Sequence, residues 1–150
     1  MAWSMVLASA VSAKAEKQQP LKLVQTTSRS GLRLVDSEQT GATFVNEITV
    51  ASAAENQVLL NGSGVAAGDF DLDGLPDLYF CGLENDNVLY RNLGGFRFEP
   101  IGDETVACPR IPSTSAAFAD LNGDSHLDLL VGTVGRGLII LINDTRGGVS

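Results

Sequence analysis

The sequence has few of the residues on which enzymes and redox proteins depend. Its 150 residues include one histidine, His126, and two cysteines. The cysteines do not form a CxxC pair, which argues against a zinc ribbon or a thioredoxin-type redox site. The chain also lacks the GxSxG elbow that would hold a nucleophilic serine. We therefore expect no catalytic residues in this chain, and we expect that it is not an enzyme.

Basic residues and long apolar runs are also scarce. Ten Lys and Arg residues stand against eighteen Asp and Glu residues, which gives a formal net charge of -8. A nucleic-acid partner would require a basic stripe, so none is expected. A membrane helix requires about 18 apolar residues, and the run at 137–142 is only long enough for a strand. Membrane insertion is therefore not expected.

The first 40 residues lack the pattern of a folded domain. Residues 1–15 are apolar and end in Ala-Lys-Ala, a small-x-small cleavage pattern, so we predict a signal peptide and a secreted or extracytoplasmic protein. A misassigned gene start is the alternative. Residues 16–40 are polar and predict a leader or linker, with the folded part at 41–150. In an oxidising compartment Cys81 and Cys108 could form a disulfide, and free buried thiols are the equal alternative.

The sequence does contain an acidic loop that occurs twice. Residues 69–77 read DFDLDGLPD, and residues 120–128, displaced by 51 positions, read DLNGDSHLD. Seven of the eighteen acidic residues lie in these loops. Such crowding is repulsive unless a cation sits among the carboxylates, and Ca²⁺ accepts six to eight oxygen ligands. We therefore predict two Ca²⁺ sites, with metal-free acidic β-turns as the alternative.

Short apolar runs around the loops predict β-strands. They lie at 65–67, 78–81, 88–91, 96–98, 116–118, 129–131 and 138–142. A period of about 50 residues indicates a repeat architecture, so we expect an all-β fold, a partial β-propeller of about two four-stranded antiparallel blades. Repeat 1 spans about 62–101 and repeat 2 about 113–150. Residues 41–44 resemble 95–98, which predicts the last strand of a preceding blade. The second round stops early, so we expect an N-terminal fragment with the remaining blades downstream.

The end of each loop distinguishes it from an EF-hand. An EF-hand requires a bidentate Glu at position 12, where this chain has Phe80 and Val131. Asp at position 9 followed by an apolar strand instead resembles the calcium loops of FG-GAP and VCBS repeats, found in the β-propellers of integrin α chains and many secreted bacterial proteins. The resemblance covers about 64–143. Residues 62–69, 87–93 and 117–120 look most like the cartilage acidic protein and ASPIC/UnbV group.

The resemblance implies a ligand set for each loop. Side chains at positions 1, 3, 5 and 9 would bind the metal, together with the backbone carbonyl at position 7. The first loop would supply Asp69, Asp71, Asp73, Asp77 and the carbonyl of Leu75; the second would supply Asp120, Asn122, Asp124, Asp128 and the carbonyl of His126. Position 6 should turn through a positive φ, which Gly74 does readily and Ser125 does with strain. We therefore expect the first loop to bind Ca²⁺ more tightly than the second.

These expectations combine into one functional hypothesis and one alternative. The first is a noncatalytic calcium-binding propeller module for extracellular adhesion, which recognises a protein or a glycan. The alternative is the N-terminal portion of a larger secreted enzyme or electron-transfer-associated protein, with its active site beyond residue 150. The sequence identifies neither the ligand nor the number of blades.

Overall fold

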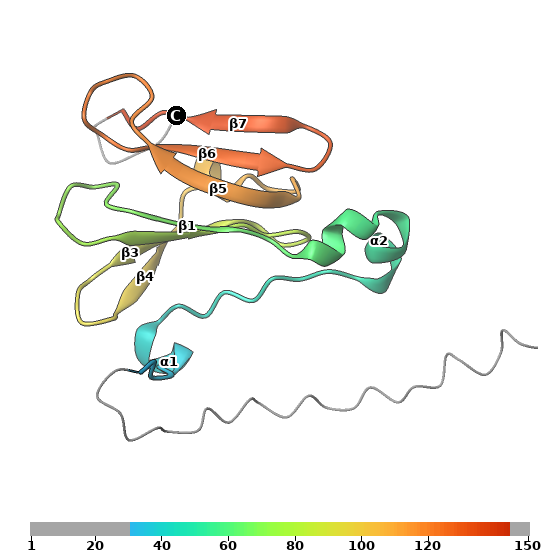
Figure 1. The fold of residues 1–150 in the computed structure, drawn as a ribbon, viewed down its shortest axis with the longest axis horizontal. Helices are drawn as coiled ribbons and strands as arrows, with labels where there is room; N and C mark the ends of the chain where they lie inside the picture. Colours follow the sequence, from blue (N-terminus) through green and yellow to red (C-terminus); the bar gives the residue numbers. More distant parts are fainter. Residues whose placement is uncertain (1–30, 145–150) are drawn as a thin grey trace, which may run out of the picture. The chain divides into compact units, whose positions relative to one another are not determined.

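The computed structural model describes residues 31–144, and every helix and strand belongs to the unit that begins at Val35. The predicted signal peptide and residues 16–30 of the predicted leader lie outside the described residues. Within residues 31–144, no helix is long and apolar enough to cross a membrane. The architecture is all-β, with two antiparallel sheets and a few short helices, as Figure 1 shows.

The first sheet has four strands in chain order. They are β1 (Val65–Gly68), β2 (Asp77–Phe80), β3 (Val88–Asn92) and β4 (Phe98–Ile101). The acidic loop 69–76 joins β1 to β2. Alternate residues of β2 are buried, as expected for a strand with two differently covered faces. The strand order and the position of the loop confirm the sequence prediction for this repeat.

The second sheet repeats the arrangement with three strands. They are β5 (Ser113–Ala119), β6 (Asp128–Thr133) and β7 (Gly137–Leu141). The second acidic loop joins β5 to β6, so both loops occupy the same place in their sheets. The pairing register is also repeated: Leu78 opposes Tyr90 in the first sheet, and Leu129 opposes Leu141 in the second. The two sheets are therefore copies of one structural unit.

One predicted strand is displaced. The run 96–98 was expected to form a strand, but β4 begins at Phe98 because residues 93–97 form a turn. Gly94, Gly95 and Phe96 all have positive φ values, which a strand does not allow. The N–H of Leu93 donates to the carbonyl of Arg97 at 2.7 Å and closes the turn.

The prediction of a strand at 41–44 is wrong. The structure places α1 at Ser37–Thr40, and Gly41 ends it in the left-handed conformation (φ 76°) with its N–H on the carbonyl of Ser37. The chain then crosses the first sheet without joining it. The ring of Phe44 stacks on Phe80 with ring centres 5.3 Å apart. The segment is thus held by side-chain contact, not by strand pairing.

Three further short helices were not predicted. They are α2 (Val50–Glu55), η1 (Gln57–Asn61) and α3 (Glu104–Ala107). Thr49, Asn56 and Asp103 each accept a backbone N–H as side-chain N-caps. These caps stabilise short helices in segments for which the sequence pattern predicted no regular secondary structure.

The core lies between the two sheets, which Figure 1 shows stacked one over the other. It combines Ala66, Phe70, Tyr79, Cys81, Leu89, Val106, Cys108, Leu129, Val131 and Leu141. At the closest approach, a Cβ added to Gly64 would lie 2.7 Å from Cα of Ser115, so this position requires glycine. Cys81 and Cys108 are both buried and free, so the structure has no disulfide between them.

A polar network crosses the same core and joins three segments. The Tyr79 hydroxyl donates to the Val106 carbonyl at 2.7 Å and accepts from Nδ2 of Asn87 at 2.8 Å. Nδ2 of Asn87 also donates to Oγ of Ser113 at 3.0 Å, and Oδ1 of Asn87 accepts from the N–H of Gly82 at 2.7 Å. Because buried polar groups are expensive unless paired, this network fixes how the sheets are connected.

Candidate metal centre

The first acidic loop is built by carboxylates that accept backbone N–H groups. Asp69 accepts from the N–H groups of Asp73 at 3.0 Å and Gly74 at 2.9 Å. Oδ1 of Asp71 accepts from Asp73 at 3.3 Å, and Oδ1 of Asp73 accepts from Leu75 at 2.8 Å. Each acid at positions 1, 3 and 5 thus bends the chain around itself, as Asp does in tight turns.

Asp77, the ninth residue of the loop and the first of β2, connects the loop to the neighbouring strand β3. Its side chain is fully buried at the start of β2. Oδ2 accepts the N–H of Phe70 at 3.1 Å, and Oδ1 accepts the N–H of Asn92 on β3 at 2.8 Å. Burial raises the pKa of Asp77, the two N–H groups lower it, and the nearby charges of Asp71 and Asp73 raise it further.

Three of the four predicted side-chain ligands of this loop converge. Asp69, Asp71 and Asp77 each present an oxygen, and these oxygens lie within 4.8 Å of one another. Asp73 is not a member of this group. Carboxylate oxygens gathered in this way are the ligand type that hard cations such as Ca²⁺ prefer. The donor set therefore fits a calcium ion, with Asp69, Asp71 and Asp77 as the residues that would hold it.

A basic side chain also reaches this cluster. Nε of Arg91, on β3, lies 2.8 Å from Oδ2 of Asp71, and the guanidinium carbon lies 5.9 Å from the ring centre of Phe70. Nε makes no hydrogen bond among the described residues, so the contact with Asp71 is an ion pair without hydrogen-bond geometry. Ile142 occupies the equivalent position 51 residues later. Only the first loop therefore has a positive charge from the third strand.

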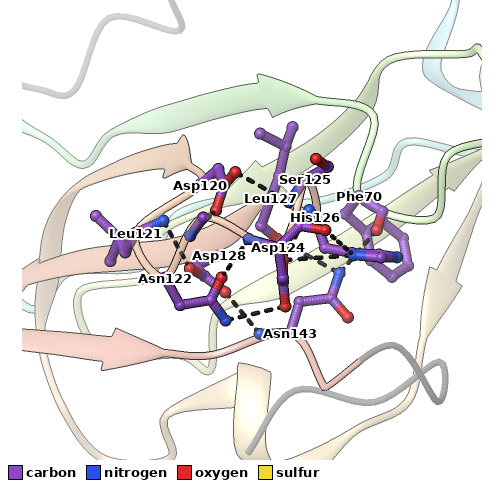
Figure 2. A network of polar contacts seen from close by, with 11 residues as sticks. Phe70, Asp120, Leu121, Asn122, Asp124, Ser125, His126, Leu127, Asp128 and Asn143 are labelled. Carbon is purple, nitrogen blue, oxygen red and sulfur yellow. Dashed lines mark hydrogen bonds and ion pairs between the residues drawn. The ribbon is translucent and has the colours of Figure 1, made fainter.

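The second loop, drawn in Figure 2, has a similar backbone pattern, although its first acid accepts from positions 4 and 6 and not from positions 5 and 6. Asp120 accepts the N–H groups of Gly123 at 2.7 Å and Ser125 at 3.0 Å. Oδ1 of Asn122 accepts from Asp124, and its amide nitrogen donates to Oδ2 of Asp124 at 2.9 Å. Among the described residues, the acids of this loop do not form a convergent group like that of the first.

The ring of His126 folds back onto the loop. Its Nδ1 lies 3.2 Å from the carbonyl oxygen and 3.4 Å from Oδ1 of Asp124. The backbone N–H of His126 lowers the pKa of Asp124, and the amide of Asn122 adds to the effect. The carbonyls of Leu75 and His126 stay predicted ligands.

Asp128 and Asn143 reproduce the contacts of Asp77 and Asn92. Asp128 is fully buried and accepts the N–H groups of Leu121 and Asn143, both at 2.9 Å. Asn92 donates its side-chain amide to the carbonyl of Pro76 at 2.8 Å, and Asn143 donates to Leu127 at 3.4 Å. These asparagines were not among the residues predicted for the loops. Their separation of 51 positions, the period of the loops, was the signal that could have identified them.

Backbone strain does not separate the two loops as we expected. Position 6 has a positive φ in both, 87° at Gly74 and 72° at Ser125. Position 4 does too, and there the residue types are reversed: Leu72 has φ 60° and Gly123 has φ 80°. Each loop therefore places one glycine and one side-chain-bearing residue in the left-handed region. The strain at Ser125 is thus offset by Leu72 in the first loop, and the expectation of a weaker second site rests on the number and convergence of the carboxylates.

The fold and the loops define a class of protein, a tandem β-repeat with an acidic loop between the first and second strand of each unit. Among known families, the FG-GAP-like repeat matches residues 69–131, from the first residue of one loop to the strand after the other. The match confirms the resemblance to FG-GAP repeats, which suggest a β-propeller-like module and typically occur in extracellular or surface proteins. No curated protein matches the chain, and no solved structure does.

Proposed function

We propose that this chain is a calcium-binding segment of a β-propeller that acts outside the cytoplasm as a noncatalytic recognition module. The observation that carries the proposal is the convergence of Asp69, Asp71 and Asp77 within 4.8 Å. Asp77 is fully buried; its burial raises its pKa, and the charges of Asp71 and Asp73 raise it further. A divalent cation would relieve this repulsion and would supply charge neutralisation at the loop.

Calcium would order the loop and would not do chemistry. The carboxylates at positions 1, 3 and 5 are already bonded to the loop backbone, and the histidine of the chain contacts Asp124 within the second loop. A bound ion would fix the connection between β1 and β2 and the surface beside it. The ligand of that surface would be a protein or a glycan. The sequence segments 62–69 and 87–93 favour a relationship to the ASPIC/UnbV group.

The proposal is tested by calcium titration of the whole chain, followed by calorimetry and by thermal unfolding. Binding to the folded state alone at a concentration of about 100 Kd raises the free energy of unfolding by about 2.7 kcal/mol. Asp71→Asn should abolish the stronger site and Asp124→Asn the weaker one. Glu55→Gln, on an exposed residue of α2, is the matched control and should change nothing. No calcium binding at millimolar concentration would overturn the proposal.

A further inference from the structure

One hydrogen bond connects the second repeat directly to the acidic loop of the first. Nδ2 of Asn143, two residues beyond β7, donates to the carbonyl of Phe70 at 2.8 Å, a contact that Figure 2 draws. Phe70 is the second residue of the first loop, 73 positions away in the chain. Asn92, the equivalent of Asn143 in the first repeat, donates its amide to Pro76 of its own loop. Asn143 thus crosses between the repeats, and the printed bond of the Asn92 amide stays within one.

The bond is the middle step of a relay between the two buried aspartates. Oδ1 of Asp128 accepts the backbone N–H of Asn143 at 2.9 Å, and the side chain of Asn143 holds the carbonyl of Phe70. The N–H of Phe70 in turn donates to Oδ2 of Asp77 at 3.1 Å. Asp77 and Asp128 are 0% exposed, Asn143 is 4% exposed and Phe70 is 5% exposed. Because hydrogen bonds are stronger in a buried environment, the relay ties the position of one loop to that of the other.

Phe70 is the residue through which this relay reaches the candidate metal site. It lies between Asp69 and Asp71, two of the three residues whose carboxylate oxygens converge. Its carbonyl belongs to the peptide group that leads into Asp71, so Asn143 fixes the backbone next to that ligand. An ordered second loop holds Asn143 in place. The first loop then loses less conformational freedom when it closes around a cation.

We propose that Asn143 is a positioning residue that couples the two loops, so that Ca²⁺ bound in one loop tightens its binding in the other. The coupling rests on the calcium binding proposed above. Coupling between two sites is reciprocal, so each loop affects the other by the same factor. Such couplings typically change affinity by about 5–150-fold, and a relay that depends on a single hydrogen bond between the repeats should lie at the lower end, at about fivefold.

Calorimetric titration of the whole chain with Ca²⁺ tests the coupling. Asp124→Asn disables the second loop and should weaken binding in the first by about fivefold. Asp71→Asn disables the first loop and should weaken binding in the second by the same factor. In Asn143→Ala the first loop should already bind weakly, and the addition of Asp124→Asn should weaken it no further.

Asn92→Ala is the matched control. It removes the same side chain at the equivalent position, but the bond of its amide to Pro76 lies within the first repeat. Asn92→Ala should weaken the first loop directly, and the addition of Asp124→Asn should still weaken it by about a further fivefold. Circular dichroism checks the folding of each variant. The comparison of wild type with Asp124→Asn does not depend on the folding of Asn143→Ala.

Two results would overturn the coupling and leave the calcium proposal intact. One is an affinity of the first loop that is the same with and without a working second loop. The other is a fivefold change that persists in Asn143→Ala, because the coupling would then not pass through this residue. A complete absence of calcium binding to the wild type would overturn both proposals.

Discussion

Tyr79→Phe should show how strongly the polar network holds the two sheets together. The substitution removes only the hydroxyl and leaves the ring, which is 0% exposed. Two short bonds are lost, the one donated to the Val106 carbonyl at 2.7 Å and the one accepted from Asn87 at 2.8 Å, together with a longer contact to Sγ of Cys108 at 3.9 Å. Nδ2 of Asn87 keeps its bond to Ser113, so one N–H and one carbonyl lose a partner.

The expected loss can be estimated from these two groups. A buried donor or acceptor without a partner costs about 1–3 kcal/mol, so for the two groups the free energy of unfolding should fall by about 2–6 kcal/mol. That is a large share of the roughly 5–15 kcal/mol typical of a folded domain. Urea denaturation followed by far-UV circular dichroism measures the difference, and the slope of the transition should not change.

Tyr90→Phe is the matched control for this measurement. Tyr90 is 3% exposed on the opposite face of the first sheet, packs edge-on against Phe80, and its hydroxyl makes no hydrogen bond among residues 31–144. Its substitution should change the free energy of unfolding by less than about 0.5 kcal/mol. Equal effects of the two variants would refute the reasoning, because burial alone and not the network would then explain the loss.

Three further predictions concern the buried thiol of Cys81, the ion pair of Arg91 with Asp71, and the contact between the two sheets at Gly64. Burial raises the pKa of Cys81 from 9.0 to about 11, so the thiol loses its proton at a lower pH in the unfolded chain than in the folded one. The free energy of unfolding should therefore fall as the pH rises from 9 to about 11. In urea titrations over this pH range, Cys81→Ala should lessen the fall. Arg91→Gln removes a positive charge that lies beside Asp71, so it should tighten calcium binding to the first loop by about tenfold, or about 1.4 kcal/mol. Calorimetry measures this change, and weaker binding would contradict the prediction. Gly64→Ala should destabilise the chain by about 1–3 kcal/mol in thermal unfolding, because its Cβ would meet the backbone of Ser115, whereas Gly102→Ala, with open space around it, should not.

The strands and loops could be read from the sequence because their signals are local and repeated. Short apolar runs that begin at Leu78 and Leu129 identify strands, and the register of carboxylates identifies the loops. The contacts of Asp77 with Asn92, and of Asp128 with Asn143, could have been found from the common period, since each pair is separated by 15 positions.

The remaining features depend on contacts that no local pattern encodes. Tyr79, Asn87 and Ser113 come from three segments and meet only after the sheets have packed. The path of residues 41–44 is set by Gly41, which ends a helical turn, and by the stacking of Phe44 on Phe80. The sequence similarity between residues 41–44 and 95–98 could not reveal this path, because similar residues do not indicate whether a segment pairs with the edge of a sheet.

The two buried aspartates show that the ninth position of the loop has a structural role of its own. Both oxygens of Asp77 accept backbone N–H groups, from Phe70 and from Asn92, and Asp128 does the same in its own sheet. These bonds connect the loop to the third strand without a metal. Each oxygen retains a lone pair for a cation, so the structural role and the proposed metal role are compatible. Substitution at this position would disturb both together, and the acids at positions 3 and 5, Asp71 and Asp124, are therefore the ones that can separate calcium binding from folding.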